Sequence, residues 1–132
     1  MRLDDPQPTT ALRQLLLGLA DGIPVSTQLP REVTVPRIRI ERVGGKDENR
    51  VTSAPRFAIQ IYAADGPTAE KLTGQLALAL LEGEWPGTRT AAGHRLRGWE
   101  EESVMSFPDP DRTDLARWQI LGRLRISKLR PA

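Results

Sequence analysis

Two separated stretches of the chain alternate between apolar and charged residues. In residues 37–43, Ile38 and Ile40 fall on one face of an extended segment and charged side chains fall on the other, because successive residues of a strand point to opposite faces. Residues 117–126 repeat this pattern with Trp118, Ile120, Leu124 and Ile126. The polar positions of the two stretches are Arg37, Arg39, Glu41, Arg117, Gln119, Arg123 and Arg125. Both stretches therefore predict strands of a sheet with one apolar face and one arginine-rich face.

A polar loop and a second strand are predicted after the first strand, which we expect over residues 35–43. Residues 44–55 (GGKDENRVTSAP) are polar, and this length predicts a long loop of functional or mobile character, not a tight hairpin turn. Residues 56–63 alternate again and should form a strand antiparallel to the first. Its inward positions are Phe57, Ile59 and Ile61, and its outward positions are Ala58, Gln60 and Tyr62.

Leucine and alanine spacing predicts two helices. The first should follow a cap at Thr9 or Thr10 and end at Asp21–Gly22, because glycine tolerates the left-handed conformation past a helix end. The second should follow the N-cap Asp65 and run to about Leu81. Their apolar faces comprise Leu12, Leu15, Leu16 and Leu19 in the first, and Ala69, Leu72, Leu76, Ala79 and Leu80 in the second.

Residues 95–106 and 115–127 predict a third and a fourth strand, joined by the turn Pro108–Asp111. The order is α-β-β-α-β-β, which indicates an α+β (two-layer α/β) fold with one antiparallel or mixed four-stranded sheet and both helices packed on one face. The link from the second strand through the second helix to the third could be a right-handed crossover, which would make the sheet mixed.

Length and composition predict a single domain, residues 1–132. The chain has no cysteine, which excludes disulfides, thiolate metal sites and a cysteine nucleophile. Its first residues lack an apolar signal core, and its longest apolar run, Leu15–Leu17, is far shorter than the roughly 20 residues that span a bilayer. We therefore expect a soluble, intracellular chain with no membrane partner.

Charge is unevenly distributed although the net charge is only +2. Residues 99–111 contain five acidic residues and no basic one, whereas residues 112–130 contain six basic residues and one acidic one. Solvated faces would explain both runs. Opposite-sign patches would also suit self-association, with the acidic edge of one copy against the basic edge of the next.

Candidate chemistry is sparse. The single histidine, His94, lies in a Gly-rich segment without a nucleophile signature, so we expect a surface or strand-start residue. Glu100–Glu102 are adjacent exposed carboxylates, which lack the differing environments that an acid–base pair needs. Asp109 and Asp111 alternate with proline, which favours a rigid turn over a cation site, and Gly44–Lys46 lacks the spacing of a phosphate loop. The sequence predicts no catalytic, metal-binding or cofactor-binding residue.

The tryptophans are few enough to be structural markers. Trp99 and Trp118 lie on expected neighbouring strands and should be core or near-core residues. Trp85 lies in an expected loop, where it could be an exposed anchor for a partner or could pack over the end of the second helix.

A family resemblance rests on the order and spacing of several segments and on the Pro-Asp-Pro turn. The segments are Val43–Gly45, Pro55–Ala63, Ala69–Leu81, Phe107–Asp111 and Ala116–Ile126. Together they resemble the tail terminator (tail completion) proteins of long, non-contractile-tailed bacteriophages, especially those of actinobacterial hosts. The resemblance covers residues 29–125.

This resemblance implies a subunit that assembles into a ring, typically hexameric, at the head-proximal end of the tail tube. Such a ring stops polymerisation of the major tail tube protein, presents a surface to a head-completion or neck protein, and lets DNA pass through its lumen without sequence recognition. The resemblance implies a virion protein, assembled in the host cytoplasm, that is not an enzyme and has no cofactor. Our candidates for ring contacts, lumen lining or tube docking are the loop 44–54 and the residues Arg37, Arg39, Glu41, Lys46, Glu100, Glu102, Arg117, Arg123 and Arg125.

Two other functions remain open from the sequence. One is another head–tail neck connector or stopper protein. The other is a small nucleic-acid-binding α+β domain that uses the arginine face on phosphates, although few aromatic residues are interleaved for base stacking. A hydrolase is disfavoured because the chain has no plausible general base.

Overall fold

A computed structural model describes residues 1–131. The elements in chain order are β1 (Arg2–Leu3), α1 (Pro8–Leu19), β2 (Val25–Ser26), β3 (Arg37–Asp47), β4 (Thr52–Ala63), α2 (Gly66–Glu82), β5 (Leu96–Ser106), β6 (Ala116–Ser127) and β7 (Leu129–Arg130).

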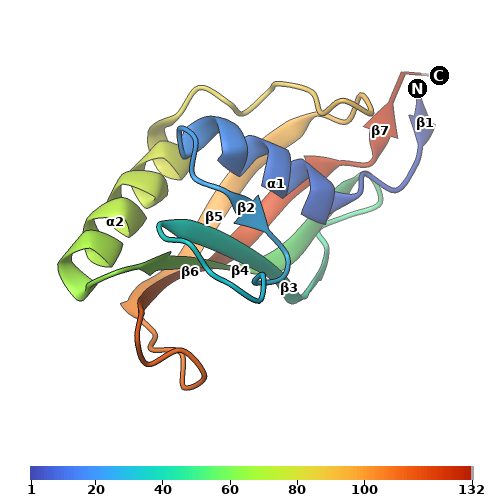
Figure 1. Cartoon of the computed structure of the whole chain (residues 1–132). Coiled ribbons are helices and arrows are strands. Elements are labelled where there is room, and N and C mark those ends of the chain that lie inside the picture. Colours follow the sequence, from blue (N-terminus) through green and yellow to red (C-terminus); the bar gives the residue numbers. More distant parts are fainter. Residues whose placement is uncertain (132) are drawn as a thin grey trace.

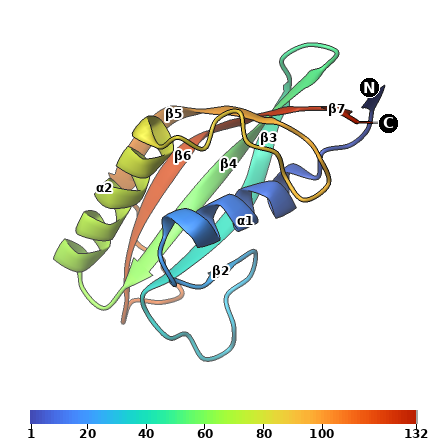
Figure 2. The ribbon, with the colours of Figure 1, turned by 90° about the horizontal axis from the view of Figure 1, so that it is seen from above.

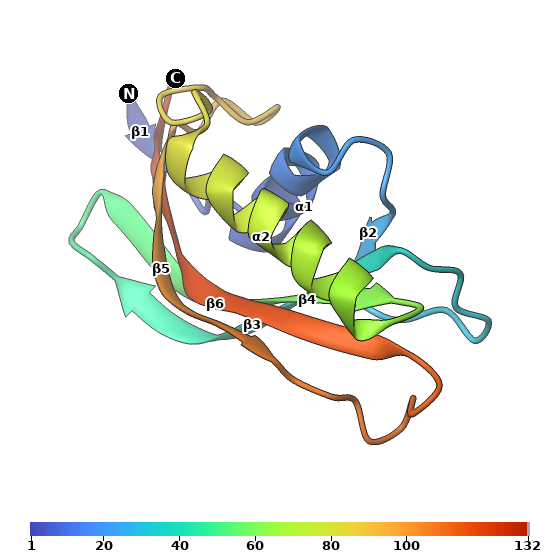
Figure 3. The same ribbon diagram turned by 90° about the vertical axis from the view of Figure 1, so that its left-hand side faces the viewer.

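Two helices cover one face of a five-stranded sheet with the order β2-β3-β4-β6-β5 (Figures 1 and 2). Viewed along the sheet, α1 and α2 lie side by side on the same side of it, and the opposite face carries no helix (Figure 3). The predicted α+β fold with both helices on one face of the sheet is confirmed, whereas the predicted order α-β-β-α-β-β holds only for the longer elements and omits the short strands β1, β2 and β7. The predicted four-stranded sheet was one strand short, because the two-residue strand β2 lies in a proline-containing connector that shows no alternation.

The sheet is mixed, for a reason that the sequence did not indicate. β2 pairs parallel with β3, whereas the other neighbouring pairs are antiparallel. β4 and β5, which α2 connects, run in the same direction but are not neighbours, because β6 lies between them.

The core lies between the helices and the helix-covered face of the sheet, here called the inner face. Phe57 and Ile59 of the central strand β4 are fully buried there, as predicted, and α1 contributes Leu12 and Leu16. Burying each such side chain stabilises the fold by about 1.5–3 kcal/mol. The remaining fully or nearly fully buried members of this cluster are Ile38, Ile40, Ile61, Leu80, Ile120, Leu124 and Ile126.

The tryptophans divide between core and periphery. Trp99 is buried and Trp118 is half-buried, in agreement with the prediction. Trp85 is buried as well, and its Nε1 donates a hydrogen bond to the carbonyl oxygen of Leu80 at 3.2 Å. Of the two alternatives for this residue, packing over the end of α2 is therefore correct.

The helix ends follow the sequence at α2 and at the C-terminal end of α1, where Asp21 and Gly22 are left-handed as predicted, but not at the N-terminal end of α1. The carboxylate of Asp65 accepts a hydrogen bond from the backbone N–H of Thr68 at 2.8 Å, which is the predicted N-cap. By contrast, α1 begins at Pro8, and its N-cap is Gln7 in a left-handed conformation without a side-chain capping bond. The prediction of a threonine cap was wrong because proline is well suited to the first position of a helix, so the helix starts before Thr9.

The expected long loop at residues 44–55 is instead a hairpin with a short turn (Figure 3). β3 continues through a bulge at Gly44 and Gly45, whose φ angles are +115° and +83°, and β4 already begins at Thr52. A side chain at Gly45 would collide with the backbone of Pro55 and Arg56, so the bulge requires glycine there. Asn49 closes the turn, since its Oδ1 accepts hydrogen bonds from the N–H groups of Val51 and Thr52. The Gly-Gly pair therefore does not end the strand, because glycine also allows a strand to continue past an irregularity.

The two ends of the described chain meet in a separate ladder. β1 and β7 form an antiparallel two-stranded sheet that holds both ends next to each other (Figure 1). The Asp4 carboxylate accepts a hydrogen bond from Arg130 Nε at 2.8 Å, which adds an ion pair to this ladder.

The contact between Trp99 and Gly122 on neighbouring strands gives a test of the sheet packing. A Cβ atom at Gly122 would lie 2.5 Å from the indole of Trp99 and 2.5 Å from the carbonyl oxygen of Glu100, whereas one at Gly98 would meet nothing within 4 Å. We predict that Gly122→Ala lowers the free energy of unfolding by about 1–3 kcal/mol, measured by urea denaturation. Gly98→Ala is the matched control and should leave stability unchanged or slightly higher. Equal losses in both variants would contradict this packing.

Candidate assembly interface

The face of the sheet opposite the helices, here called the open face, carries rows of polar side chains from neighbouring strands. In one row, Arg39 of β3 donates a hydrogen bond from Nη1 to Gln60 Oε1 at 2.8 Å, and Gln60 Nε2 donates to Gln119 Oε1 of β6 at 3.2 Å. Gln60 and Gln119 are buried although they face away from the helices. The prediction that Ala58, Gln60 and Tyr62 face away from the helices is confirmed, and these residues are nevertheless buried because long side chains from β3 and β6 cover the central strand.

Arg117 lies at the centre of a buried polar cluster at one end of the open face. Its guanidinium donates to the carbonyl oxygens of Phe107 at 2.5 Å and Pro108 at 3.2 Å, and to the hydroxyl of Tyr62 at 3.3 Å. It also lies 3.7 Å from the carboxylate of Asp109 and stacks 4.6 Å from the ring centroid of Phe107. Arg117 therefore fixes the segment between β5 and β6 to the sheet. Only 9% of Arg117 is exposed, so this predicted interface candidate has little surface of its own to offer a partner.

Asp109 and Tyr62 complete this cluster. Tyr62 donates its hydroxyl to Asp109 Oδ2 at 2.7 Å, and Asp109 Oδ1 accepts the N–H of Asp111 at 2.9 Å. Burial raises the pKa of Tyr62, and the Asp109 carboxylate raises it further, so the hydroxyl keeps the proton that it donates. Burial alone would raise the pKa of Asp109, but the bonds from Tyr62 and Asp111 and the charge of Arg117 outweigh it and lower that pKa. The predicted turn at Pro108–Asp111 is present, and the Asp109 carboxylate additionally ties it to β4.

The acidic and basic runs of the sequence pair largely within the chain. Glu102 of β5 lies 2.7 Å from Arg56 of β4, and Glu48 at the hairpin turn lies 2.7 Å from Arg125 of β6. Lys128 contacts Asp47. Glu100 lies directly opposite Arg123 in the ladder between β5 and β6, but the two form no ion pair among residues 1–131. Acidic and basic residues that are far apart in the sequence therefore neutralise each other across the strands of the folded sheet.

Eight of the nine predicted interface residues fall into two groups in the structure, and the ninth, Arg117, belongs to neither. Arg37, Arg39 and Glu41 lie along β3, where Arg37 donates to Ser26 Oγ at 3.2 Å and Arg39 lies 3.6 Å from Glu41. A second group surrounds a hollow of about 460 Å³ at the hairpin end of the open face and consists of Lys46, Glu100, Glu102, Arg123 and Arg125. Arg117 belongs to neither group and is structural.

Both edges of the sheet are largely unpaired, a feature that the sequence did not indicate. β2 pairs only with Ile38 and Arg39, so within residues 1–131 no strand pairs with the outer side of β3 over residues 41–47. On the other edge, Leu96 bonds to the backbone of Gly87 and Thr88, and the outer side of β5 is free over residues 97–106. Unpaired strand edges are templates for pairing with another chain.

Two charged residues on these edges, Arg42 and Glu101, were missed as interface candidates. Each occupies an inner-face position, because Arg42 lies opposite Phe57 and Glu101 lies opposite Gly122, yet each is exposed. A charge at an inward position, as in Ile38-x-Ile40-x-Arg42, is the signal that could have found them. It marks the point where the helical layer no longer covers the strand.

The remaining candidate chemistry has structural explanations. His94 is buried directly before β5, with Nδ1 2.9 Å from the carbonyl oxygen of Ser127, so the strand-start prediction is right and the surface prediction is wrong. Within residues 1–131, no cluster of histidine, aspartate and glutamate side chains could hold a metal ion. None of the helices in this range is long and apolar enough to cross a membrane.

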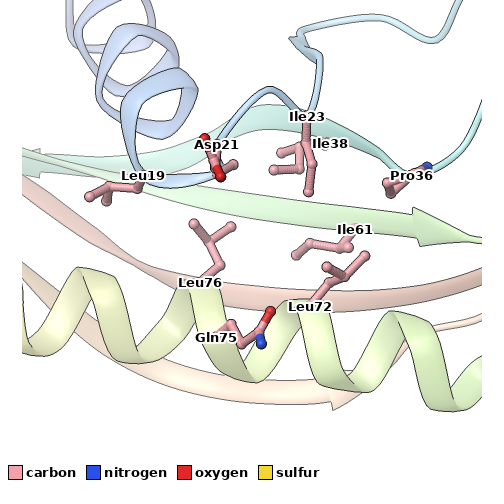
Figure 4. Close-up of a pocket in the computed structure, with 10 residues that line it drawn as sticks. Leu19, Asp21, Ile23, Pro36, Ile38, Ile61, Leu72, Gln75 and Leu76 are labelled. Carbon is pink, nitrogen blue, oxygen red and sulfur yellow. The ribbon is translucent and has the colours of Figure 1, made fainter.

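A hollow of about 390 Å³ lies between the end of α1 and the middle of α2 (Figure 4). Ile23, Ile38, Ile61, Leu72 and Leu76 supply most of its wall, and Asp21 and Gln75 supply polar side chains. Such a lining suits an apolar group and offers no set of groups for catalysis.

Comparison with known proteins identifies the fold. No protein-family model matches the sequence, and no curated protein matches it. Among solved structures, the chain is similar to a chain in the virion of a native gene transfer agent (GTA) particle, with a TM-score of 0.57 and 17% sequence identity. The match covers 92% of this chain and 89% of the other. At this level of identity the likeness establishes a shared fold.

The lowered pKa of Asp109 predicts a pH-dependent contribution to stability. We expect Asp109→Asn to reduce the free energy of unfolding by about 1–3 kcal/mol at pH 7, because Arg117 loses its charged partner. The pKa of Asp109 is lower in the folded chain than its ordinary value of 3.8, so its contribution is complete above that value. The difference between the two proteins should therefore vanish as the pH falls through the folded pKa of Asp109.

Urea denaturation at a series of pH values measures this difference. Asp111→Asn, an exposed substitution in the same turn, is the control and should have little effect at any pH. A difference between wild type and Asp109→Asn that persists at pH values well below 3.8 would contradict the assignment.

Proposed function

We propose that this chain is a structural subunit of a phage-like particle, and specifically a tail terminator protein. In this role it forms a ring, typically of six copies, that caps the tail tube at its head-proximal end. The ring stops polymerisation of the major tail tube protein and provides the surface to which the head-completion or neck protein joins. The protein would reside in the virion tail after assembly in the host cytoplasm.

The observation that carries this proposal is the likeness to a GTA virion chain over nearly the full length of both chains. The two unpaired sheet edges support it, because a ring subunit must present two different surfaces to its two neighbours. The open face supports it as well, since a polar layer with few free charges suits a wall past which DNA moves. The ion pairs of Arg56 and Arg125 with glutamates leave little positive charge to hold phosphates.

Another neck connector or stopper protein is the second candidate, because the likeness is to a component of a whole virion. The two functions differ in the binding partner. A terminator binds the end of the tail tube, whereas a connector or stopper binds the portal or the filled head. A nucleic-acid-binding domain is less well supported, since the neutralised arginines of the open face offer few phosphate contacts.

Assembly with tail tubes tests the proposal. Purified protein mixed with the major tail protein of its own particle should cap the tubes and limit their length, visible by negative-stain electron microscopy. At high concentration, or on the tubes, the protein should form closed rings. DNA affinity should be weak even at low salt, whereas a DNA-binding domain would lose about 0.9 in log K per phosphate contact for each tenfold rise in salt.

Two outcomes would contradict the proposal. A protein that stays monomeric and leaves tube length unchanged is not a terminator. A protein that ignores tubes but binds portal or head particles is a neck component of the second kind.

A further inference from the structure

The directions of the two free edges allow copies of the chain to join into one continuous sheet. β3 is antiparallel to β4, β4 to β6, and β6 to β5, so the two edge strands β3 and β5 run in opposite directions. When two copies stand side by side in the same orientation, β5 of one therefore meets β3 of the next as an antiparallel pair. Rotational symmetry about a ring axis requires this common orientation.

The register of the sheet places opposite charges in the same cross-strand row, one at each edge of the sheet. Arg42 of β3 lies in the same row as Phe57 of β4, Gly122 of β6 and Glu101 of β5. Arg42 and Glu101 are both exposed and both project toward the inner-face side. An unshifted junction between copies would thus make them a directly opposed cross-strand pair.

Close to the row of Arg42 and Glu101, the edge residues that have no charged partner within the described part of the subunit are basic on β3 and acidic on β5. On β3, Arg42 and Lys46 have no ion-pair or side-chain hydrogen-bond partner among residues 1–131, and the same holds for Glu100 and Glu101 on β5. Other edge charges are paired within the chain, namely Glu41 with Arg39, Asp47 with Lys128 and Glu102 with Arg56.

The same charges disfavour the symmetric alternative. In a register centred on Glu101, pairing β5 with β5 of a second copy would bring two glutamate runs together, and in a register centred on residue 44, pairing β3 with β3 would bring Arg42 against Lys46 of the second copy. Like charges directly opposite each other destabilise a strand pair. Heterologous pairing avoids both clashes, and it produces a closed ring when the rotation between copies closes.

We propose that neighbouring copies join edge to edge, with residues 97–103 of β5 pairing antiparallel with residues 41–47 of β3 of the next copy, and with Glu101 opposite Arg42. This inference rests on the proposed ring. It identifies the second copy as the partner of both edges and makes the ring a continuous sheet with the helices on one side and the open face on the other.

Charge reversal tests the junction. Arg42→Glu and Glu101→Arg should each raise the concentration needed for assembly by about tenfold or more, because each places like charges across every junction. The double variant should restore assembly, since it exchanges the two signs. Lys71→Glu, an equal charge change at an exposed position of α2, is the control and should assemble like wild type. Sedimentation velocity and negative-stain images of each protein, alone and with tail tubes, give the readout.

Engineered cysteines give a second, independent readout because the chain has none of its own. Positions 42 and 101 of one copy lie on opposite edges of its sheet, three strand spacings or roughly 14 Å apart, which is too far for a disulfide within the chain. Arg42→Cys combined with Glu101→Cys should therefore produce a ladder of cross-linked oligomers that stops at the copy number of the ring. Each single cysteine variant should remain uncross-linked.

The outcomes separate the junction from the proposed function. Wild-type rings that persist in both charge-reversal variants, with no cross-linked ladder, would overturn the edge junction and leave the ring intact. Dimers of Glu101→Cys alone would overturn it in favour of symmetric β5 pairing. A wild-type protein that forms no ring, alone or on tubes, would overturn both proposals.

Discussion

The register between β4 and β6 is the constraint on which the rest of the structure depends. It places Phe57, Ile59 and Ile61 under the helices and, in the same step, places Gln60 against Gln119 and Tyr62 against Arg117 on the open face. A shift of one residue would bury the polar set under the helices and expose the apolar set. The register of β4 is therefore fixed by hydrophobic burial on the inner face and by satisfied hydrogen bonds on the open face.

Much of the fold could be predicted because its main elements obey simple periodicities. Alternation located β3, β4 and β6, and the leucine stripe located α1. The failures have physical reasons. β2 is too short to alternate and forms only because Val25 and Ser26 lie beside β3. A Gly-Gly pair ends many strands, but here Gly44 and Gly45 form a bulge and the ladder continues to Asp47. Pro8 starts α1 earlier than the threonines that looked suitable as caps.

The candidate interface was predictable only in part. Sequence patterns assigned Arg39, Arg123 and Arg125 correctly to the open face, but they could not reveal how far each charge is neutralised by residues distant in the chain. Arg125 meets Glu48 across 77 positions of sequence. Arg117 also points to the open face of β6, as Arg123 and Arg125 do. It is nevertheless buried, because the segment after β5 folds back over it. The free edges depend on strand order, and strand order is a property of the whole sheet that no local pattern contains.

The separation of β4 from β6 in the sequence has a consequence for how the subunit is made. β4 can pair with β3 as soon as the hairpin is synthesised, but its other partner is the last long strand of the sheet, and α2 and β5 come between them. Until β6 emerges, β4 keeps one edge unpaired and β5 has no neighbour, so the nascent chain exposes more strand edge than the finished one. Closing this long-range contact is expected to limit the folding rate. The finished pair of free edges, β3 on one side and β5 on the other, therefore exists only once β6 has been inserted between β4 and β5.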